Sequence, residues 1–183
     1  HAELLVGRVL KETTAAGEVL GDEVVVVTKA GYVQGQNLKD AVQRRKLGDP
    51  WPEMTEYARD CWHCISPAFL RDQLSASLGR LAMPRVDLLL LHNPEYFLAD
   101  AEHRNMPLAE ARDAFYDRIG RAFEQLEKEV AAGRIGAYGV SSNTFVVPHG
   151  KADAVDLLRL LDLAGSGFAA IQLPMNPVEL GAR

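Results

Sequence analysis

Six polar side chains that could take part in chemistry follow four short apolar runs of the sequence. They are Lys29, His92, Ser141, Ser142, Asn143 and Gln172. An ammonium group can lower the pKa of a neighbouring phenol, and an imidazole with one N–H can direct a substrate oxygen. Hydroxyls and carboxamides can hydrogen-bond another carboxamide from several sides. The set therefore suits polarising a carbonyl group and holding a ring that bears an amide.

The residue types disfavour two other kinds of site. No pair of carboxylates occupies the positions after these apolar runs, which argues against glycosidase chemistry. The segment Cys61-Trp62-His63-Cys64 offers two thiols and an imidazole, but a closed zinc site needs four ligands. No second cluster of cysteine and histidine follows at zinc-finger spacing. We therefore expect no metal site.

The elements that would position the six side chains alternate between helix and strand. Apolar residues at helical spacing, with Ser66 as a cap and Gly133 as a stop, predict helices at residues 1–12, 66–81, 108–132 and 152–164. Short apolar blocks predict strands at residues 23–28, 86–91, 135–140 and 168–173. We expect the first of these strands, a run of four valines, to be buried on both faces.

The long segment from Ala30 to Ile65 is predicted to be irregular. It is too long for a plain connection, so we expect it to form a lid or part of a substrate pocket. The simpler alternative is an excursion over the surface.

Alternating strands and helices imply right-handed crossovers and a parallel sheet covered by helices. Two architectures fit: a doubly wound open sheet, and a (β/α)8 barrel, which typically takes about 250 residues and would here be only partly present. The glycine-rich turn of dinucleotide-binding open sheets is missing, which weakens the first option. In both architectures ligands bind at the carboxyl ends of the strands, so the six side chains are expected at one rim.

Composition narrows the class of protein and its partners. The 183 residues carry a net charge of −5, which disfavours a basic nucleic-acid-binding surface. The apolar runs are far shorter than the roughly 18 residues of a membrane helix. We expect residues 1–183 to form a single α/β domain that contacts neither nucleic acid nor membrane. Two cysteines are too few for a disulfide framework and no signal segment is recognisable, so a cytoplasmic location is expected.

Four segments of the sequence resemble successive strand motifs of the aldo/keto reductase family. They are Val27–Lys29, Val86–Glu95, Gly133–Asn143 and Ile171–Asn176. The likeness spans nearly the whole chain, in order. It implies a (β/α)8 TIM barrel, of which about four βα units of eight fall in this sequence. It also implies an oxidoreductase that reduces an aldehyde or ketone, or oxidises the alcohol, and acts on a small carbonyl or sugar-like substrate. The implied cofactor is NADPH, with NADH as the alternative.

The resemblance also assigns roles to particular residues. Lys29 and His92 match the lysine and histidine of the family's catalytic centre. Ser141, then Ser142 or alternatively Asn143, and Gln172 match the residues that hold the nicotinamide carboxamide. In the implied reaction a hydride passes to the carbonyl carbon while a tyrosine, made more acidic by the lysine, donates a proton to the oxygen. The family's aspartate and tyrosine are expected just before residue 1, and its last barrel strands and 2′-phosphate pocket after residue 183.

Two alternatives from other classes remain. One is a noncatalytic, reductase-like binding or auxiliary subunit, which would have no need of both Lys29 and His92. The other is a complete doubly wound domain of other function, which the order of the strands would reveal. The reductase interpretation requires the side chains of Lys29 and His92 to lie at the same end of the sheet and to share a small pocket.

Overall fold

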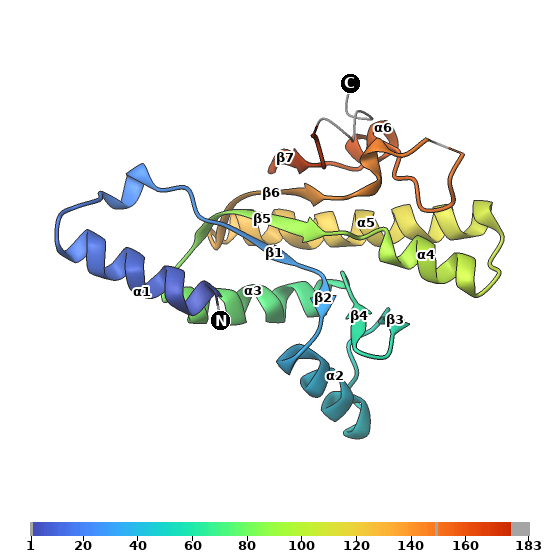
Figure 1. The fold of residues 1–183 in the computed structure, drawn as a ribbon, viewed down its shortest axis with the longest axis horizontal. Coiled ribbons are helices and arrows are strands. Elements are labelled where there is room, and N and C mark those ends of the chain that lie inside the picture. The colour runs from blue at the N-terminus through green and yellow to red at the C-terminus, as the bar shows by residue number, and fades with distance from the viewer. Residues whose placement is uncertain (1, 149, 177–183) are drawn as a thin grey trace.

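Four parallel strands form the sheet at the centre of the molecule (Figure 1). They are β1 (Val27–Ala30), β5 (Val86–His92), β6 (Ile135–Ser141) and β7 (Phe168–Gln172). The strands pair in the order β1-β5-β6-β7, and all three pairs are parallel. The computed structural model describes residues 2–148 and 150–176 of the chain.

The order of these strands distinguishes the two architectures that fit the sequence. A doubly wound sheet changes its direction of growth at a switch point, whereas a barrel adds each strand beside the one before it. Among the described residues every strand of the parallel sheet is added in the same direction. Right-handed crossovers then place the connecting helices on one face. The predicted α/β class is confirmed, and the sheet is that of a partial (β/α)8 barrel.

The helices connect these strands and cover the sheet. Over the described residues they are α1 (Ala2–Ala15), α2 (Gln36–Lys46), α3 (Pro67–Leu81), α4 (Tyr96–His103), α5 (Leu108–Ala131) and α6 (Leu157–Leu161), with single 3-10 turns at η1 (Gly21–Glu23) and η2 (Thr144–Val146). The predictions of α1, α3 and α5 are confirmed within a few residues. The prediction for residues 152–164 is too long, and α4 was not predicted. No helix in the described part of the chain is long and apolar enough to cross a membrane.

Helix α3 begins where the sequence signals predict. The hydroxyl of Ser66 accepts a hydrogen bond from the backbone N–H of Phe69, and Pro67 occupies the first helical position. Leu70 and Leu74 of this helix are almost fully buried in the main core, which also contains Phe115 of α5 and Leu89 of β5. Helix α3 packs on β1 and α5 packs on β6, so the two helices fix the positions of these strands.

The first strand differs from the prediction in position and in burial. It begins at Val27 rather than at Glu23, and the valine run is not buried on both faces. Val26 is 7% exposed, but Val25 is 73% and Val27 47% exposed. The reason is that β1 has β5 on one side only and α3 on one face only among the described residues. Side chains that point to the other face therefore remain in contact with solvent.

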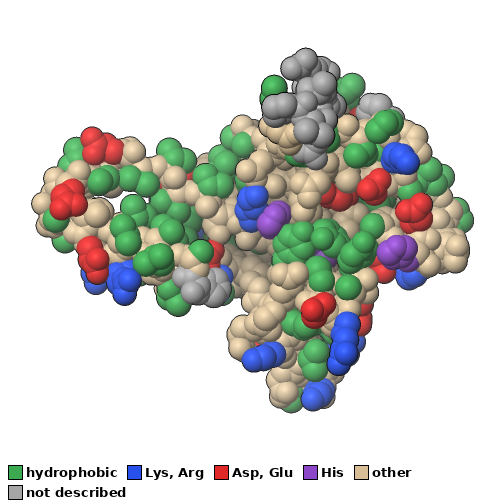
Figure 2. All heavy atoms as spheres, in the orientation of Figure 1, with side chains coloured by type: hydrophobic (Ala, Val, Ile, Leu, Met, Phe, Trp, Pro, Cys, Tyr) green, Lys and Arg blue, Asp and Glu red, His purple; other side chains and the backbone are tan. Residues whose placement is uncertain are grey.

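The prediction that residues 30–65 are irregular is wrong. They contain β2 (Tyr32–Val33), α2, β3 (Thr55–Ala58) and β4 (Cys61–His63), and the strands form an antiparallel sheet in the order β2-β4-β3. We call this unit the antiparallel lobe. It has its own small core of Val33, Ala41, Trp51, Trp62, Cys64 and Phe69. In Figure 1 it projects from the parallel sheet, and Figure 2 shows basic side chains gathered on it.

Candidate active site

The register of the parallel sheet brings the ends of four strands to one rim. His92 of β5 lies beside Ser141 of β6, and Ser141 lies beside Gln172 of β7. Lys29 of β1 pairs with Leu90, two residues before His92. Lys29, His92, Ser141 and Gln172 all line a cavity of about 290 Å³, together with Asn93, Asn143, Leu173 and Pro174. The side chains of Lys29 and His92 thus lie at the same end of the sheet and share a pocket.

A hydrogen-bonded chain connects three of these residues. Lys29 Nζ donates to Ser141 Oγ at 3.2 Å. Ser141 Oγ in turn donates to Gln172 Oε1 at 2.9 Å. The side-chain oxygen of Gln172 is therefore already hydrogen-bonded. The side-chain amino group of Gln172 takes no part in these hydrogen bonds and is available to a ligand. The ammonium group, the hydroxyl and the carboxamide are fixed relative to one another across three strands.

The charges at the rim favour a neutral imidazole beside an ammonium ion. Burial lowers the pKa of His92 below its ordinary value, and the positive charge of Lys29 lowers it further. Partial burial also lowers the pKa of Lys29. A neutral His92 carries one N–H donor, which is the state required to direct a carbonyl oxygen.

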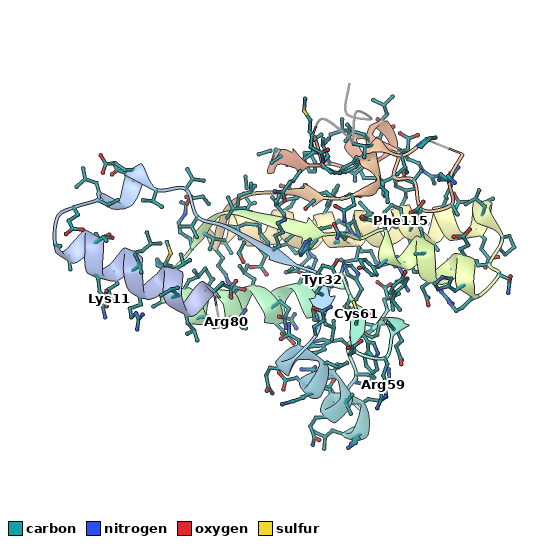
Figure 3. The ribbon with its side chains drawn as sticks, viewed as in Figure 1. Lys11, Tyr32, Arg59, Cys61, Arg80 and Phe115 are labelled. Carbon is teal, nitrogen blue, oxygen red and sulfur yellow. The ribbon has the colours of Figure 1, made fainter. Side chains whose placement is uncertain are left out.

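Tyr32 of the antiparallel lobe packs against His92. The two ring centroids are 4.6 Å apart and the rings are nearly perpendicular, an edge-to-face contact. The side-chain amide of Asn93 donates to the hydroxyl of Tyr32 at 2.9 Å, and the backbone N–H of Asn93 donates to the carbonyl of Ser141 at 2.7 Å. Asn93 has a φ of 51°, a left-handed conformation that asparagine tolerates better than most residues. These contacts hold the His92 ring from the side of the lobe, where Figure 3 labels Tyr32.

His63 and Gly31 attach the antiparallel lobe to the end of β5. His63 Nε2 lies 2.8 Å from the carbonyl oxygen of His92, and since a carbonyl only accepts, Nε2 carries the proton. Burial lowers the pKa of His63 to about 4. A Cβ at Gly31 would lie 2.6 Å from His63 Nε2 and 2.8 Å from the His92 carbonyl, so only glycine permits this approach. Neither residue was predicted from the sequence to take part in the site. The one sequence feature that pointed to this contact is that Gly31 follows the candidate lysine, Lys29, by two positions.

Ser142 is the one candidate that the structure does not bring to the cavity. Its hydroxyl is buried, lies 3.2 Å from that of Thr144 and accepts the backbone N–H of Thr144 at 3.1 Å. Asn143, the alternative at this point of the sequence, lines the cavity instead. Among the described residues the side chain of Asn143 has no hydrogen-bond partner, which leaves its carboxamide available to a ligand.

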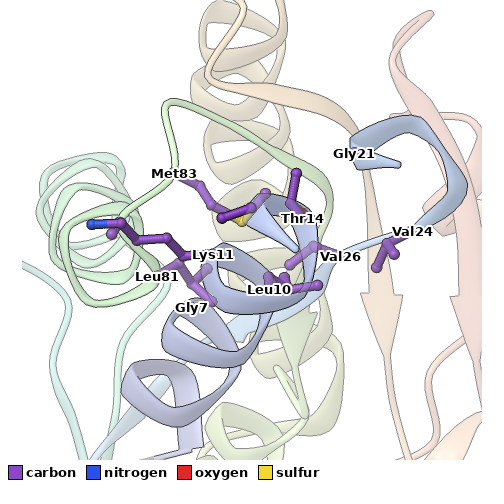
Figure 4. Close-up of a pocket in the computed structure, with 11 residues that line it drawn as sticks. Gly7, Leu10, Lys11, Thr14, Gly21, Val24, Val26, Leu81 and Met83 are labelled. Atoms are coloured by element: carbon purple, nitrogen blue, oxygen red, sulfur yellow. The ribbon is translucent and has the colours of Figure 1, made fainter. Parts of the chain in front are cut away.

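A second cavity, of about 400 Å³, lies away from this rim. Figure 4 shows it between α1 and the residues that precede β1, where Leu10, Val24, Val26, Leu81 and Met83 form its wall. Lys11 and Thr14 are the lining residues with polar side chains. This cavity lies near the amino end of β1, opposite to the end at which barrel enzymes carry their chemistry. Its lining offers no acid–base pair.

The two cysteines do not form a metal site in the structure. Cys64 is buried and its thiol donates to the carbonyl of Pro52 at 3.3 Å, while Cys61 is half-buried and accepts from the Gln34 amide at 3.2 Å. Across residues 2–148 and 150–176, no group of three or more His, Cys, Asp or Glu side chains is arranged to hold a metal ion. Most of the side chains that line the rim cavity are polar.

Comparison with known protein families gives one match over nearly the whole chain. The sequence profile of the aldo/keto reductase family matches residues 1–182. A search of curated proteins found no match.

Solved structures with a similar fold include three aldo-keto reductases or related dehydrogenases. An aldo-keto reductase of the silkworm Bombyx mori has a TM-score of 0.53 and 18% identity, over 94% of this chain and 38% of its own, and it has also been solved complexed with NADPH. The holo form of an aldo-keto reductase from Bacillus halodurans has a TM-score of 0.55 and 18% identity, over 94% of this chain and 39% of its own. A glycerol dehydrogenase from Gluconobacter oxydans has a TM-score of 0.52 and 22% identity, over 96% of this chain and 37% of its own.

These similarities concern the fold. The chain spans about two fifths of the length of the solved structures that it matches.

Proposed function

The chain belongs to the aldo/keto reductase family, and from this membership we propose that the protein is an NADP(H)-dependent oxidoreductase. It reduces an aldehyde or ketone, or oxidises the corresponding alcohol, at the rim formed by the ends of β1, β5, β6 and β7. One observation carries the proposal. Lys29, Ser141 and Gln172 form a hydrogen-bonded chain, and all three share a cavity with His92.

The donors and acceptors at the rim fit a nicotinamide carboxamide. That group offers one carbonyl acceptor and one amino donor. The amino group of Gln172 and the unpaired carboxamide of Asn143 supply complementary partners, and the Ser141 hydroxyl lies between Lys29 and Gln172. We assign Ser142 to support of the turn that follows β6, because its hydroxyl lies against that of Thr144. NADPH is the proposed cofactor and NADH the alternative.

The residues of the chain then have the following roles. When bound, the reduced cofactor supplies the hydride that the carbonyl carbon accepts. The neutral imidazole of His92 donates its N–H to the carbonyl oxygen and orients it. The ammonium group of Lys29 stabilises the phenolate form of a neighbouring tyrosine and so makes it a better proton donor. That tyrosine is the one that the family carries at its catalytic centre. Hydride to carbon and proton to oxygen together balance the reduction to the alcohol.

The replacement His92→Ala tests this proposal in the intact natural protein. Loss of the orienting donor is expected to lower kcat for aldehyde reduction by about a hundredfold, the lower end of what a positioned acid or base contributes. The dissociation constant of NADPH is expected to change little, because His92 is not among the proposed carboxamide partners. Stopped-flow or steady-state loss of NADPH absorbance measures the first quantity, and fluorescence titration measures the second.

The matched control is His103→Ala, which removes a histidine exposed on the last turn of α4. Its turnover is expected to match that of the natural protein. Unchanged turnover in His92→Ala would contradict the catalytic assignment. Cofactor binding by the natural protein without any turnover of carbonyl substrates would instead favour a reductase-like auxiliary subunit.

A further inference from the structure

A buried carboxyl group lies behind the turn that carries Asn143. Glu95 follows His92 by three residues, directly before α4, and is only 6% exposed. Its Oε1 accepts a hydrogen bond from the backbone N–H of Asn143 at 3.0 Å. Its Oε2 is buried and has no hydrogen-bond partner among the described residues. Burying a carboxyl with one oxygen unpaired costs free energy. We therefore look for a role of the other oxygen, Oε1, that an apolar side chain could not fill.

The contribution of Oε1 is to fix one backbone position of the turn. Residues 141–143 are otherwise held by their neighbours in the sheet: the Asn93 N–H donates to the Ser141 carbonyl at 2.7 Å, and the Ser142 N–H donates to the Gln172 carbonyl at 2.9 Å. At Asn143 the sheet has ended, and the carboxyl of Glu95 takes over as acceptor. Because the Asn143 side chain has no partner of its own in the described structure, its direction depends on this backbone contact.

We infer that Glu95 is a positioning residue, which holds the backbone of Asn143 so that the Asn143 carboxamide faces the rim cavity and binds the nicotinamide ring. This inference rests on the proposed function. Glu95 itself does not line the cavity and acts only through Asn143.

The hydrogen bond from the Asn143 N–H requires an acceptor at Glu95, and both the charged and the uncharged carboxyl supply one. Burial raises the pKa of the Glu95 carboxyl, an effect larger than the opposing effects of the nearby Ser142 hydroxyl and Asn143 N–H. The negative charge of Asp153 raises it further. An uncharged carboxyl keeps a carbonyl oxygen as acceptor. A glutamine at this position has the same length and the same acceptor, whereas a methionine has a similar length and lacks it.

The first experiment compares Glu95→Gln with Glu95→Met in the intact natural protein, with NADPH as the probe in a fluorescence titration. Glu95→Met is expected to raise the dissociation constant of NADPH about tenfold, the effect of one lost hydrogen bond. Glu95→Gln is expected to restore it to within about twofold of the natural value. The KM for the carbonyl substrate is expected to change little in either variant, since Glu95 does not touch that part of the cavity. Glu95→Asp, which is polar but too short to reach Asn143, serves if Glu95→Met does not fold and is expected to behave like it.

A double-mutant cycle with Asn143→Ala separates positioning from general stabilisation. Asn143→Ala is expected to weaken NADPH binding by itself. Adding Glu95→Met to Asn143→Ala is expected to change the dissociation constant by less than about twofold, because there is no longer a carboxamide to position. If Glu95 has a purely structural role, Glu95→Met will weaken NADPH binding by the same factor in the natural protein and in Asn143→Ala.

The outcomes divide as follows. Three results would overturn the inference while the proposed function stands. They are an equal loss of NADPH affinity in Glu95→Gln and Glu95→Met, an unchanged dissociation constant in Glu95→Met, and additive losses of NADPH affinity in the double-mutant cycle. If the natural protein binds neither NADPH nor NADH, the proposed function fails, and the role of Glu95 fails with it.

Discussion

Ser141 connects the charged and the neutral parts of the rim. A hydroxyl has one donor and two acceptor sites, so it accepts from the Lys29 ammonium and donates to the Gln172 carboxamide at the same time. An alanine would break both bonds, and an asparagine would add volume between β1 and β7. The position thus needs a small group that both donates and accepts. Serine meets this requirement at the end of β6.

We expect His63 to make the stability of the protein depend on pH. Its pKa is lowered by burial to about 4 from an ordinary value of 6.5. Between these values the unfolded state binds more protons than the folded state, so the free energy of unfolding falls as the pH decreases from 6.5 towards 4. The shift corresponds to about 3 kcal/mol in full. Denaturant unfolding at pH 7 and pH 4.5 measures the larger part of this loss.

The variant His63→Gln keeps an N–H donor for the His92 carbonyl and removes the titrating group. Its free energy of unfolding is expected to depend less steeply on pH over this window than that of the natural protein. His103→Gln, at an exposed position, is expected to keep the full dependence. A pH dependence that is identical in His63→Gln and the natural protein would show that His63 does not carry it.

The strands β6 and β7 approach each other through a glycine. A Cβ on Gly139 would lie 2.0 Å from the carbonyl oxygen of Ala170 and 2.9 Å from a methyl group of Leu90. The backbone of β7 therefore occupies the space that a side chain would need. Since Gln172 lies two residues beyond Ala170, this close approach also sets where Gln172 meets Ser141.

Replacing Gly139 by alanine is expected to lower the free energy of unfolding by about 1–3 kcal/mol, the range found for overpacked cores. Gly120 of α5 is the matched control. A Cβ there meets no atom within 4 Å, and alanine favours a helix more than glycine does, by about 1 kcal/mol. Thermal or denaturant unfolding of the two variants should therefore change in opposite directions. Similar effects of the two substitutions would contradict the packing at Gly139.

The elements with strong periodic patterns were predictable, and the short ones were not. Helix α5 presents apolar residues at three- and four-residue intervals over its 24 residues, and β5 contains a run of four leucines, so both stand out from sequence alone. The strands of the antiparallel lobe have two to four residues each, too few to show a period. Helix α2 is mostly polar and buries only Ala41, so its stability comes from packing that the local sequence does not reveal.

The parallel sheet ends on both sides in strands without an outer partner among the described residues. Strand β1 pairs only with β5, and β7 only with β6. Beside the first edge Val25 and Val27 are 73% and 47% exposed, and on β7 Ile171 is 39% exposed. Unpaired strand edges with apolar side chains are templates for pairing with another chain.

A polypeptide of residues 1–183 alone is therefore expected to associate as its concentration rises. Size-exclusion chromatography with light scattering at several concentrations measures this. Val25→Lys places a charge beside the β1 edge and is expected to reduce the association. Val42→Lys, on the exposed side of α2 in the antiparallel lobe, is the control and is expected to have little effect. A stable monomer at all concentrations would contradict the expectation.

Local sequence was sufficient to identify the class of fold and the residues at the strand ends. An apolar block followed by a polar residue marks the end of a buried strand, and parallel strands end at one rim, so Lys29, His92, Ser141 and Gln172 could be grouped without coordinates. These inferences use only neighbours along the chain and the regular geometry of βα units.

Long-range contacts decided which side chains enter the cavity and what stands behind them. Ser142 faces inward and Asn143 faces the rim because the Ser142 N–H is bound by Gln172 and the Asn143 N–H by Glu95, which lie 30 and 48 residues away. The same is true of His63, whose ring reaches the carbonyl of His92 across 29 residues. At a strand end the alternation of side chains stops, and the direction of each one is then set by hydrogen bonds to distant segments, which no local pattern encodes.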